Sequence, residues 1–515
     1  MTPITNGTNA EESRVPDATA RAMLAVLFLV SILNFMDRQI ITILLGEIKT
    51  AFKVTDAQLG LLSGTVFSAF YTVFGIPLGV YADRGSRRAL IGWGLGLWSV
   101  MTGLCGFASS FPALAIARMG VGIGEASAAP AAYSLIAEAY PREKRGSALG
   151  LYSLGIYIGI GLSTFVGGLI VDSWNQRYAT GEAPLGMAGW QAAFLVAAIP
   201  GLLLVPFVFA IREPARTEPR ESAGAARAAF REGLALLPPS SFYFLSRDAV
   251  PIAPNVAAFA ILSGAGIALS LTVGNPVQWI CLGIGLYVVT TLAQRLRTLE
   301  PQTHAIIFGT PSLSLATLGF SFLSINGYAM GFFIPVFLPR YHGLSNTYVG
   351  AVWGLISAVC GGLGVMTGGY LSDRFRARWP WGRLGVGVMN ALLPLPFLIP
   401  ALLSTNTEQT LLLLAAAQFF AAMWLGAGSS TVQDLVLPRM RARASAVFIL
   451  FINLISLALG PYVVGRLSDH WGSLRDALIA ASGSNLVALG LFALASRTIA
   501  RDEATKEARA AAAQG

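Results

Sequence analysis

Long, continuous apolar segments dominate the chain, and short polar connections separate them. Each segment is long enough to cross roughly 30 Å of hydrocarbon as a helix that rises about 1.5 Å per residue. Because the apolar runs are not interrupted by alternating polar positions, they predict helices rather than the strands of a membrane β-barrel. Six segments lie in the first part of the chain and six in the last, near 21–45, 57–81, 89–108, 112–137, 147–171 and 190–211, and near 312–338, 347–371, 384–404, 410–436, 445–467 and 476–496.

The connection between the two sets of segments is unusually long. It begins polar and rich in arginine, and it becomes apolar at 249–272 and again at 277–294. We predict an extra transmembrane hairpin here, and the alternative is a hairpin that lies in the interface or packs on the outside. The expected organisation is a cytoplasmic tail, a six-helix bundle, a linker with the hairpin, a second six-helix bundle and a second cytoplasmic tail, at 1–20, 21–211, 212–311, 312–496 and 497–515.

Composition excludes several classes of protein. Hydrophobic residues make up 55% of the chain and charged residues only 12%, against about a quarter charged in ordinary soluble domains. A soluble enzyme, a disordered chain or a disulfide scaffold is therefore not expected. The three cysteines stand singly in apolar runs and the three histidines are scattered, so no metal site is predicted. No GxxxxGK[ST] phosphate-binding loop is present, which argues against an ATP-driven pump.

The basic residues fall mainly on one side of the predicted layout. If the amino terminus is inside, the inner connections hold 21 of the 35 lysines and arginines and the two tails hold 6 more, whereas the outer connections hold 6. Such an excess predicts that both tails are cytoplasmic. The number of spans must then be even, which fourteen satisfies and which twelve also satisfies if the extra hairpin does not cross.

The two sets of segments repeat each other. The block Gly79–Arg84 that ends the second segment recurs as Gly369–Arg374. Pro141 and Asp172 bound a later segment, and Pro438 and Asp469 bound its counterpart 297 residues further on. Shared order and direction predict two parallel six-helix halves, the architecture of transporters that bind substrate between repeats and rock around that site.

These motifs resemble the major facilitator superfamily. The segment from Gly79 to Arg88 is similar to the signature loop of that family between its second and third helices, with Ser86 where the family has glycine. The resemblance implies the major facilitator fold and a cytoplasmic gate in which charged groups hold that side closed in one state; the alternative is that the charges only mark the membrane boundary. The predicted gate residues are Gly79, Asp83, Arg84, Arg87, Arg88, Asp373 and Arg374.

A narrower resemblance is to the spinster branch of transporters. It rests on Asn34-Phe35-Met36-Asp37-Arg38 in the first segment and on the run from Ala117 to Ala126 in the fourth. Animal members export sphingosine-1-phosphate or lysophospholipids, and bacterial relatives are treated as proton-coupled. The resemblance implies a monomer, while the extra hairpin departs from the twelve-helix pattern of the family. The arginine-rich composition, with 31 arginines and 4 lysines, suits a bacterial inner-membrane protein.

Four charges lie inside predicted spans. A charge at membrane depth costs at least about 2.5 kcal/mol and therefore usually faces a cavity or a partner. Helical rise places Asp37 and Arg118 at similar depth and Glu125 deeper, and Arg118 and Glu125, seven residues apart, share one helix face. Asp37 and Arg38 are adjacent and point apart, so different partners are expected for them. We predict that Asp37 and Glu125 carry protons and that Arg38 and Arg118 are their switchable counter-charges; the alternative is a static ion-pair network.

Polar and aromatic residues inside the spans are candidates for lining a cavity between the halves. Each of them is individually more often a packing residue. The candidates are Tyr133, Asn326, Tyr328, Trp353, Trp424, Gln433 and Asn453.

The sequence thus predicts a proton-coupled secondary transporter that works by alternating access. The family resemblance implies a lysophospholipid or sphingoid-type lipid as substrate, with drug or organic-anion transport as the alternative. A non-transporting sensor or a lipid-modifying membrane enzyme is the other class considered. We expect no enzyme, because no histidine and no cluster of nucleophile and base lies inside a span. The expected partners are the bilayer, protons and a small amphipathic substrate, with no nucleic acid and no cofactor beyond the proton gradient.

Overall fold

The protein is helical throughout the part of the chain that the structure, a computed structural model, describes. That part comprises residues 17–179, 181–214 and 222–513. Most of the predicted amino-terminal tail and the last two residues of the carboxyl-terminal tail lie outside it, as do Arg216 and Arg220 of the linker.

The first half contains the six predicted apolar segments, several of them divided by breaks. Its helices are α1 (Asp17–Gln39), α2 (Ile41–Phe52), α3 (Asp56–Gly60), η1 (Leu61–Thr65), α4 (Val66–Arg84), α5 (Arg87–Gly106), α6 (Phe111–Glu125), α7 (Ala128–Ala139), α8 (Arg142–Arg177), η2 (Pro184–Gly186) and α9 (Gly189–Ala210).

The linker between the halves is also helical. Its helices are α10 (Ser222–Leu236), α11 (Ser240–Arg247), α12 (Ala253–Thr272), α13 (Pro276–Leu299) and α14 (Pro301–Ile307). The extra hairpin predicted at 249–272 and 277–294 is therefore present as α12 and α13, and both helices are long and apolar enough to cross a membrane. The arginine-rich segment before it forms α10, which packs against α4.

The second half repeats the first. Its helices are α15 (Pro311–His342), α16 (Asn346–Arg376), α17 (Gly382–Leu392), α18 (Leu395–Leu403), α19 (Thr407–Ala421), α20 (Trp424–Leu435), η3 (Pro438–Met440), α21 (Arg441–Phe451), η4 (Ile452–Leu457), α22 (Ala458–Trp471), α23 (Leu474–Ala481), α24 (Ser484–Ala504) and α25 (Lys506–Ala512).

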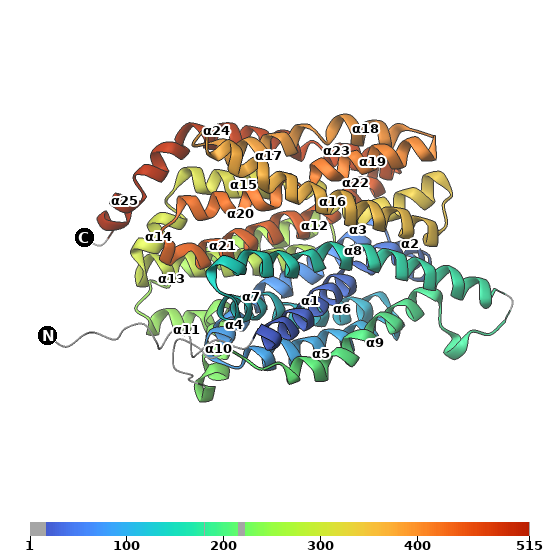
Figure 1. Cartoon of the computed structure of the whole chain (residues 1–515), viewed down its shortest axis with the longest axis horizontal. Helices are drawn as coiled ribbons and strands as arrows, with labels where there is room; N and C mark the ends of the chain where they lie inside the picture. The colour runs from blue at the N-terminus through green and yellow to red at the C-terminus, as the bar shows by residue number, and fades with distance from the viewer. Residues whose placement is uncertain (1–16, 180, 215–221, 514–515) are drawn as a thin grey trace.

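The two halves form two bundles that lie side by side. Figure 1 shows the first half, blue to green, below the second half, yellow to red, with α8 and α16 packed along each other between them. The linker helices α10, α11 and α14 lie at the end of the molecule where α25 lies, at the left of Figure 1, whereas α2, α18 and α19 lie toward the opposite end. We call these ends the linker side and the far side. The sequence predicts that the linker side is cytoplasmic.

Within the described residues, thirteen helical segments are long and apolar enough to cross a membrane. The fourth predicted segment, near 112–137, is not among them. It is divided into α6 and α7 by a turn after Glu125, and it contains Arg118 and Glu125. Among the predicted spans, this one therefore looks least like a membrane helix by apolar length alone.

The two halves contact each other along two interfaces that are related by the internal repeat, and we call these interfaces seams. One seam joins α8 to α16, and the other joins α3–α4 to α22. On one seam, a side chain at Gly350 of α16 would bring its Cβ within 2.2 Å of the Thr164 carbonyl oxygen on α8. On the other, a Cβ at Gly60 of α3 would lie 2.3 Å from the Pro461 carbonyl oxygen on α22. Only glycine lets the backbones approach so closely, as at other contacts between membrane helices.

Two π-helical segments face each other at the second of these seams. They are η1, which precedes α4, and η4, which precedes α22. A Cβ at Gly64 of η1 would lie 2.2 Å from the carbonyl oxygen of Leu457 of η4. Short π-helical turns inside α-helices frequently mark functional sites, because they displace the helix and free a carbonyl group.

Candidate functional site

The charged residues predicted inside the first half come together in one cluster. Arg38, in the last turn of α1, forms an ion pair of 2.9 Å with Glu125, the last residue of α6. The Glu125 side chain is 0% exposed and that of Arg38 is 13% exposed. A buried carboxylate is costly unless it is paired, and here the guanidinium provides the pairing charge.

Aromatic rings surround the free faces of the Arg38 guanidinium. Its central carbon lies 4.9, 4.6 and 4.7 Å from the ring centres of Phe35, Phe67 and Tyr71. Such cation–π contacts stabilise a guanidinium most where water is excluded. Tyr328 of α15, in the second half, is near enough to Arg38 for a charge interaction between the two side chains.

Asp37 points to a different environment from that of Arg38, as the sequence predicted for adjacent helical residues. It is fully buried, and neither of its carboxylate oxygens has a hydrogen bond of good geometry within the described residues. The side chains of Glu125, Arg118 and Trp98 interact with it electrostatically. An ionised carboxylate in this position is expensive unless something compensates its charge.

Arg118 holds the main chain at the break between α1 and α2. Its two terminal nitrogens donate to the carbonyl oxygens of Asp37 (3.0 Å) and Arg38 (3.1 Å), and the side chain is fully buried. The sequence predicted Arg118 as a counter-charge or an anion-binding residue. Its hydrogen bonds suit a positioning residue that fixes the peptide groups carrying Asp37 and Arg38, and the counter-charge role stays a prediction.

Replacing this clamp is expected to destabilise the fold. The Arg118→Met variant keeps a long side chain but leaves two buried carbonyl groups without a donor, which costs about 2 kcal/mol. We expect a lower midpoint of thermal unfolding in detergent than for Arg84→Met, which removes an exposed arginine. Equal midpoints for the two variants would show that Arg118 does not hold the break.

The seven candidate cavity residues differ in how exposed their side chains are and in what they contact. Tyr133 is exposed and packs edge-to-face on Tyr152 at 5.5 Å, and Tyr328 is half-buried near Arg38. Gln433 is exposed, and Trp424 is half-buried and packs on Phe320. Side chains that are buried in helix packing are Asn326, Trp353 and Asn453. A lining role stays a prediction for all seven, and Tyr133 and Tyr328 have the surroundings that fit it best.

The predicted gate residues on the linker side interact mainly within their own halves. Arg87 pairs with Glu138 of α7 at 2.6 Å, and the Arg88 guanidinium donates to the carbonyl oxygens of Phe209 and Ile211 at the end of α9. In the second half Asp373 pairs with Arg383 at 3.0 Å.

The remaining four gate residues are Gly79, Asp83, Arg84 and Arg374. Asp83, Arg84 and Arg374 are exposed, and Gly79 lies in α4 with open space beside its Cα. The ion pair of Arg87 and that of Asp373 each lie within one half. The gating role stays a prediction.

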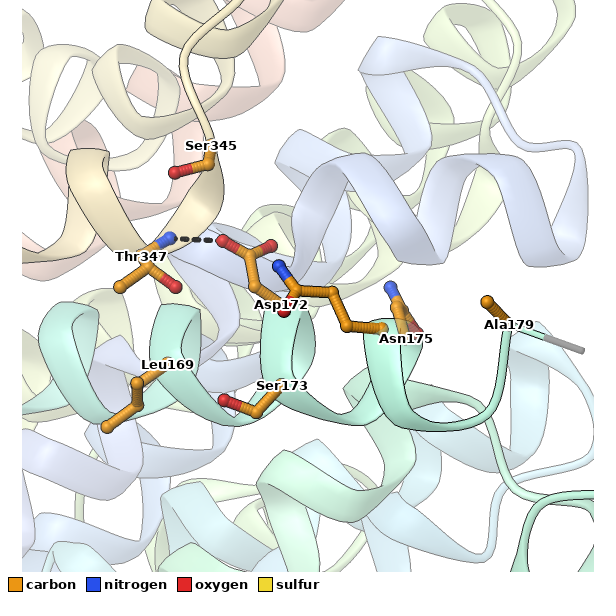
Figure 2. Close-up of a pocket in the computed structure, with 8 residues that line it drawn as sticks. Leu169, Asp172, Ser173, Asn175, Ala179, Ser345 and Thr347 are labelled. Atoms are coloured by element: carbon orange, nitrogen blue, oxygen red, sulfur yellow. Dashed lines mark hydrogen bonds between the residues drawn. The ribbon is translucent and has the colours of Figure 1, made fainter.

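The far side is closed by two matched contacts between the halves. Asp172 near the end of α8 accepts hydrogen bonds from the Thr347 amide (2.6 Å) and from the Asn346 side chain (3.1 Å), both in the first turn of α16. Figure 2 shows the Asp172 carboxylate pointing at this helix end. It borders an open hollow of about 640 Å³ that Ser173, Asn175 and Ser345 also line.

The same contact recurs on the other seam. Asp469 near the end of α22 accepts from the Asp56 and Ala57 amides at 2.9 and 2.8 Å, at the start of α3. A carboxylate at a helix amino terminus satisfies unpaired amides and interacts favourably with the helix dipole. Asp172 and Asp469 stood out in the sequence only as repeated positions 297 residues apart, and that repetition was the signal of their shared role.

An ion-pair network reinforces the second of these contacts. The side chain of Asp56 accepts two hydrogen bonds from Arg340 at 2.9 and 3.1 Å, and it also accepts from Lys49 and Ser468. Because Arg340 belongs to α15 and Ser468 to α22, three segments of the two halves meet at one buried carboxylate. From the sequence, Lys49 and Arg340 are only two of the six basic residues counted in the outer connections.

The arrangement suits an exchange of ionic partners rather than bond-making chemistry. It holds two buried carboxyl groups and two arginines beside the interface of the halves. No group of three or more histidine, cysteine, aspartate or glutamate side chains that could hold a metal ion occurs in the part of the chain that the structure describes.

Comparison with known proteins gives consistent results. The sequence profile described as Major Facilitator Superfamily matches residues 27–461. The chain is 29% identical over 459 residues to an MFS-type efflux pump of Mycolicibacterium smegmatis, which covers 89% of this chain and 86% of that protein. It is 25% identical over 463 residues to protein spinster homolog 1 of Xenopus laevis, with 86% and 72% covered.

Among solved structures, the chain is similar to a bacterial homologue of the human lysosomal transporter Spinster in an inward-facing and unoccupied conformation. The TM-score is 0.72 with 24% sequence identity, and the match covers 95% of this chain and 99% of that one. At this identity the likeness establishes the fold.

Proposed function

Because the chain belongs to the major facilitator superfamily, we propose that it is a proton-coupled secondary active transporter that works by alternating access. The observation that carries the proposal is the buried Arg38–Glu125 ion pair beside Asp37, which has no good hydrogen-bond partner of its own. Protonation of Glu125 would remove the charge that holds Arg38. The guanidinium would then be released toward the second half, where Tyr328 lies.

Alternating access requires that the closed side be able to open. The far side is held by hydrogen bonds and ion pairs between the halves, while Arg87 and Asp373 on the linker side pair within their own halves. This pattern supports an inward-facing state, if the linker side is cytoplasmic as the excess of basic residues predicts. A bacterial inner membrane with both termini inside fits that orientation.

We propose an amphipathic lysophospholipid or sphingoid-type lipid as the substrate. The lipid class is what the spinster resemblance of the sequence implies, and the chain is similar to a protein spinster homolog. Arg38 suits an anionic head group, and the rings of Phe35, Phe67 and Tyr71 around it suit an attached apolar chain. A monomer is expected, with no cofactor beyond the proton gradient.

Drug efflux is the second candidate. Similarity to the mycobacterial efflux pump favours it, because that protein has the higher identity of the two curated relatives compared. Both candidates use the same coupling site and differ in what the cavity accepts. Organic-anion transport is a variant of the same scheme in which Arg38 binds the anion.

Proteoliposomes separate these candidates. A fluorescent lysophospholipid is added outside, with and without an imposed pH gradient, and the lipid that albumin cannot extract is measured. We expect movement that depends on the gradient and is absent from protein-free vesicles. If the lipid is not transported but a cationic drug or an organic anion is transported in a gradient-dependent way, the lipid assignment is wrong and the proposed coupling site is retained.

A further inference from the structure

The extra hairpin covers one of the two seams between the halves. Its helix α13 lies over the junction of α4 with η4. Val288 packs with Val73 of the first half together with Leu236 of α10, and Val289 packs with Leu450 and Leu454 of the second. Helix α12 packs on α13 and exposes most of its own apolar side chains. The hairpin thus has an inner helix against both halves and an outer helix against the membrane.

A buried polar junction joins α13 to both halves near its start. The Thr65 hydroxyl of η1 lies against the side-chain oxygen of Gln278 and against the main-chain oxygen of Ala458 (2.7 Å). Gln278 Nε2 donates to the same Ala458 oxygen at 3.4 Å. Because unsatisfied polar groups are costly inside a membrane, three segments that share hydrogen bonds in this way are held in register.

The hairpin is also fastened internally near the linker side. Asn255 of α12 donates to Thr291 of α13 at 3.0 Å, and Tyr287 of α13 contacts Ser241 of α11 at 2.6 Å. All four side chains are buried. A buried hydrogen-bond network of this kind holds the two helices of the hairpin and α11 in a defined arrangement.

Because the two halves repeat each other, the seam that the hairpin covers can be compared with an equivalent seam that it does not cover. The helix caps Thr55 and Ser345 lie 290 positions apart, as do Asp83 and Asp373, so α3–α4 and α16 align along their whole length. Asp172 and Asp469 align α8 with α22 at a spacing of 297. The seam of α8 with α16 is therefore the counterpart of the seam of α22 with α4.

Equivalent residues on the two seams differ sharply in exposure. Val73 is 8% exposed and its counterpart Leu363 is 53% exposed, while Tyr462 is 2% exposed and its counterpart Phe165 is 40% exposed. The chemistry differs as well, because Thr65, 0% exposed against Gln278, corresponds to Leu355, which is 65% exposed. At this pair of equivalent positions, the seam covered by the hairpin has a buried polar residue, Thr65, and the uncovered seam has an exposed apolar residue, Leu355.

We propose that the α12–α13 hairpin seals the seam between α4 and α22 against membrane lipid, so that the seam between α8 and α16 is the one that lipid reaches. The sealing goes beyond the proposed function and does not depend on which substrate, if any, is carried. Without the linker helices over it, Val73 would be exposed as its counterpart Leu363 is, and Leu450 and Leu454 would lose the Val289 side chain that covers them.

Labelling from within the bilayer tests the seal directly. The whole protein is reconstituted into phosphatidylcholine vesicles that contain a phospholipid with a diazirine on its acyl chain. After illumination, labelled residues are located by mass spectrometry. We expect label at Phe165, Leu355 and Leu363 at least tenfold above that at Val73 and Tyr462. Equal labelling of the two seams in the unmodified protein would overturn the proposal.

A bulky substitution on α13 can be used to separate the hairpin from the second half, and a neighbouring glycine provides the control position. A Cβ at Gly285 would lie 2.1 Å from the Leu454 side chain, whereas a Cβ at Gly283 would meet nothing within 4 Å. Gly285→Trp should lift α13 from η4 and raise labelling of Leu450 and Leu454 severalfold, and Gly283→Trp should leave it unchanged. A rise of the same size in both variants, or in neither, would contradict the seal. The wild-type comparison decides the matter if the Gly285→Trp variant does not fold.

Discussion

The Glu125→Gln variant is expected to lose accumulation of substrate against its gradient while it still exchanges substrate between the two sides of a vesicle. Glutamine keeps the shape of the side chain and can still accept a hydrogen bond from Arg38, but it cannot gain or lose a proton. For one proton per substrate, a gradient of one pH unit stores about 1.4 kcal/mol and supports about tenfold accumulation. In the variant we expect that accumulation to disappear.

Two measurements on the same vesicles isolate the effect. Accumulation is measured under an imposed pH gradient, and counterflow is measured without one. The control is Glu182→Gln, which alters an exposed glutamate in the connection before α9 and should behave as wild type. If Glu125→Gln accumulates substrate as wild type does, Glu125 is not the proton carrier and the Arg38–Glu125 pair is a static packing element.

Removing the two carboxylates that close the far side should shift the conformational equilibrium. Asp172→Asn and Asp469→Asn each replace a charged acceptor at a helix amino terminus by a neutral one. Such contacts contribute about 1 kcal/mol each where they are partly exposed to water. The double variant should therefore favour far-side opening by about 2 kcal/mol, which is roughly 30-fold in the ratio of the two states.

The distance between spin labels on the two halves reports this change. Cysteines at the exposed far-side positions Gln176 and Thr405 carry the labels in a background without the three native cysteines. We expect a longer distance to gain population in the double variant, with each single variant in between. Asp476→Asn, at the start of α23 on the same side, is the matched control. An unchanged distribution in the double variant would mean that the aspartates do not set the equilibrium.

Sequence alone predicted the parts of the fold that depend on apolar length and repetition. Twelve segments, the extra hairpin and the two parallel halves follow from these patterns, and the helices lie where the segments were expected. The profile match and the structural likeness confirm the family resemblance drawn from the motif at Gly79–Arg88. The sequence predicted that the charges inside the spans need partners, because each is costly alone, but it did not single out the pairing of Arg38 with Glu125.

Other parts of the site depend on contacts that leave no pattern in the chain. The partners of Arg118 are main-chain carbonyls at a helix break, and a carbonyl group carries no residue identity. The partners of Asp172 and Asp469 are helix amino termini of the opposite half, which become visible only when the halves are packed together. The docking site of α13 was equally hidden, because an apolar helix without a polar face can pack in many orientations. Thr65 and Gln278, polar residues inside apolar runs, were its available signal.

The most direct test of the central claim is the movement of protons when substrate is added to wild-type proteoliposomes without an imposed gradient. A pH-sensitive dye trapped inside the vesicles follows the lumen after addition of lysophospholipid, or of a drug or organic anion if the lipid is not carried. The account predicts a change of luminal pH that depends on substrate and is absent in Glu125→Gln. Substrate transport with no movement of protons in the wild-type protein would contradict it.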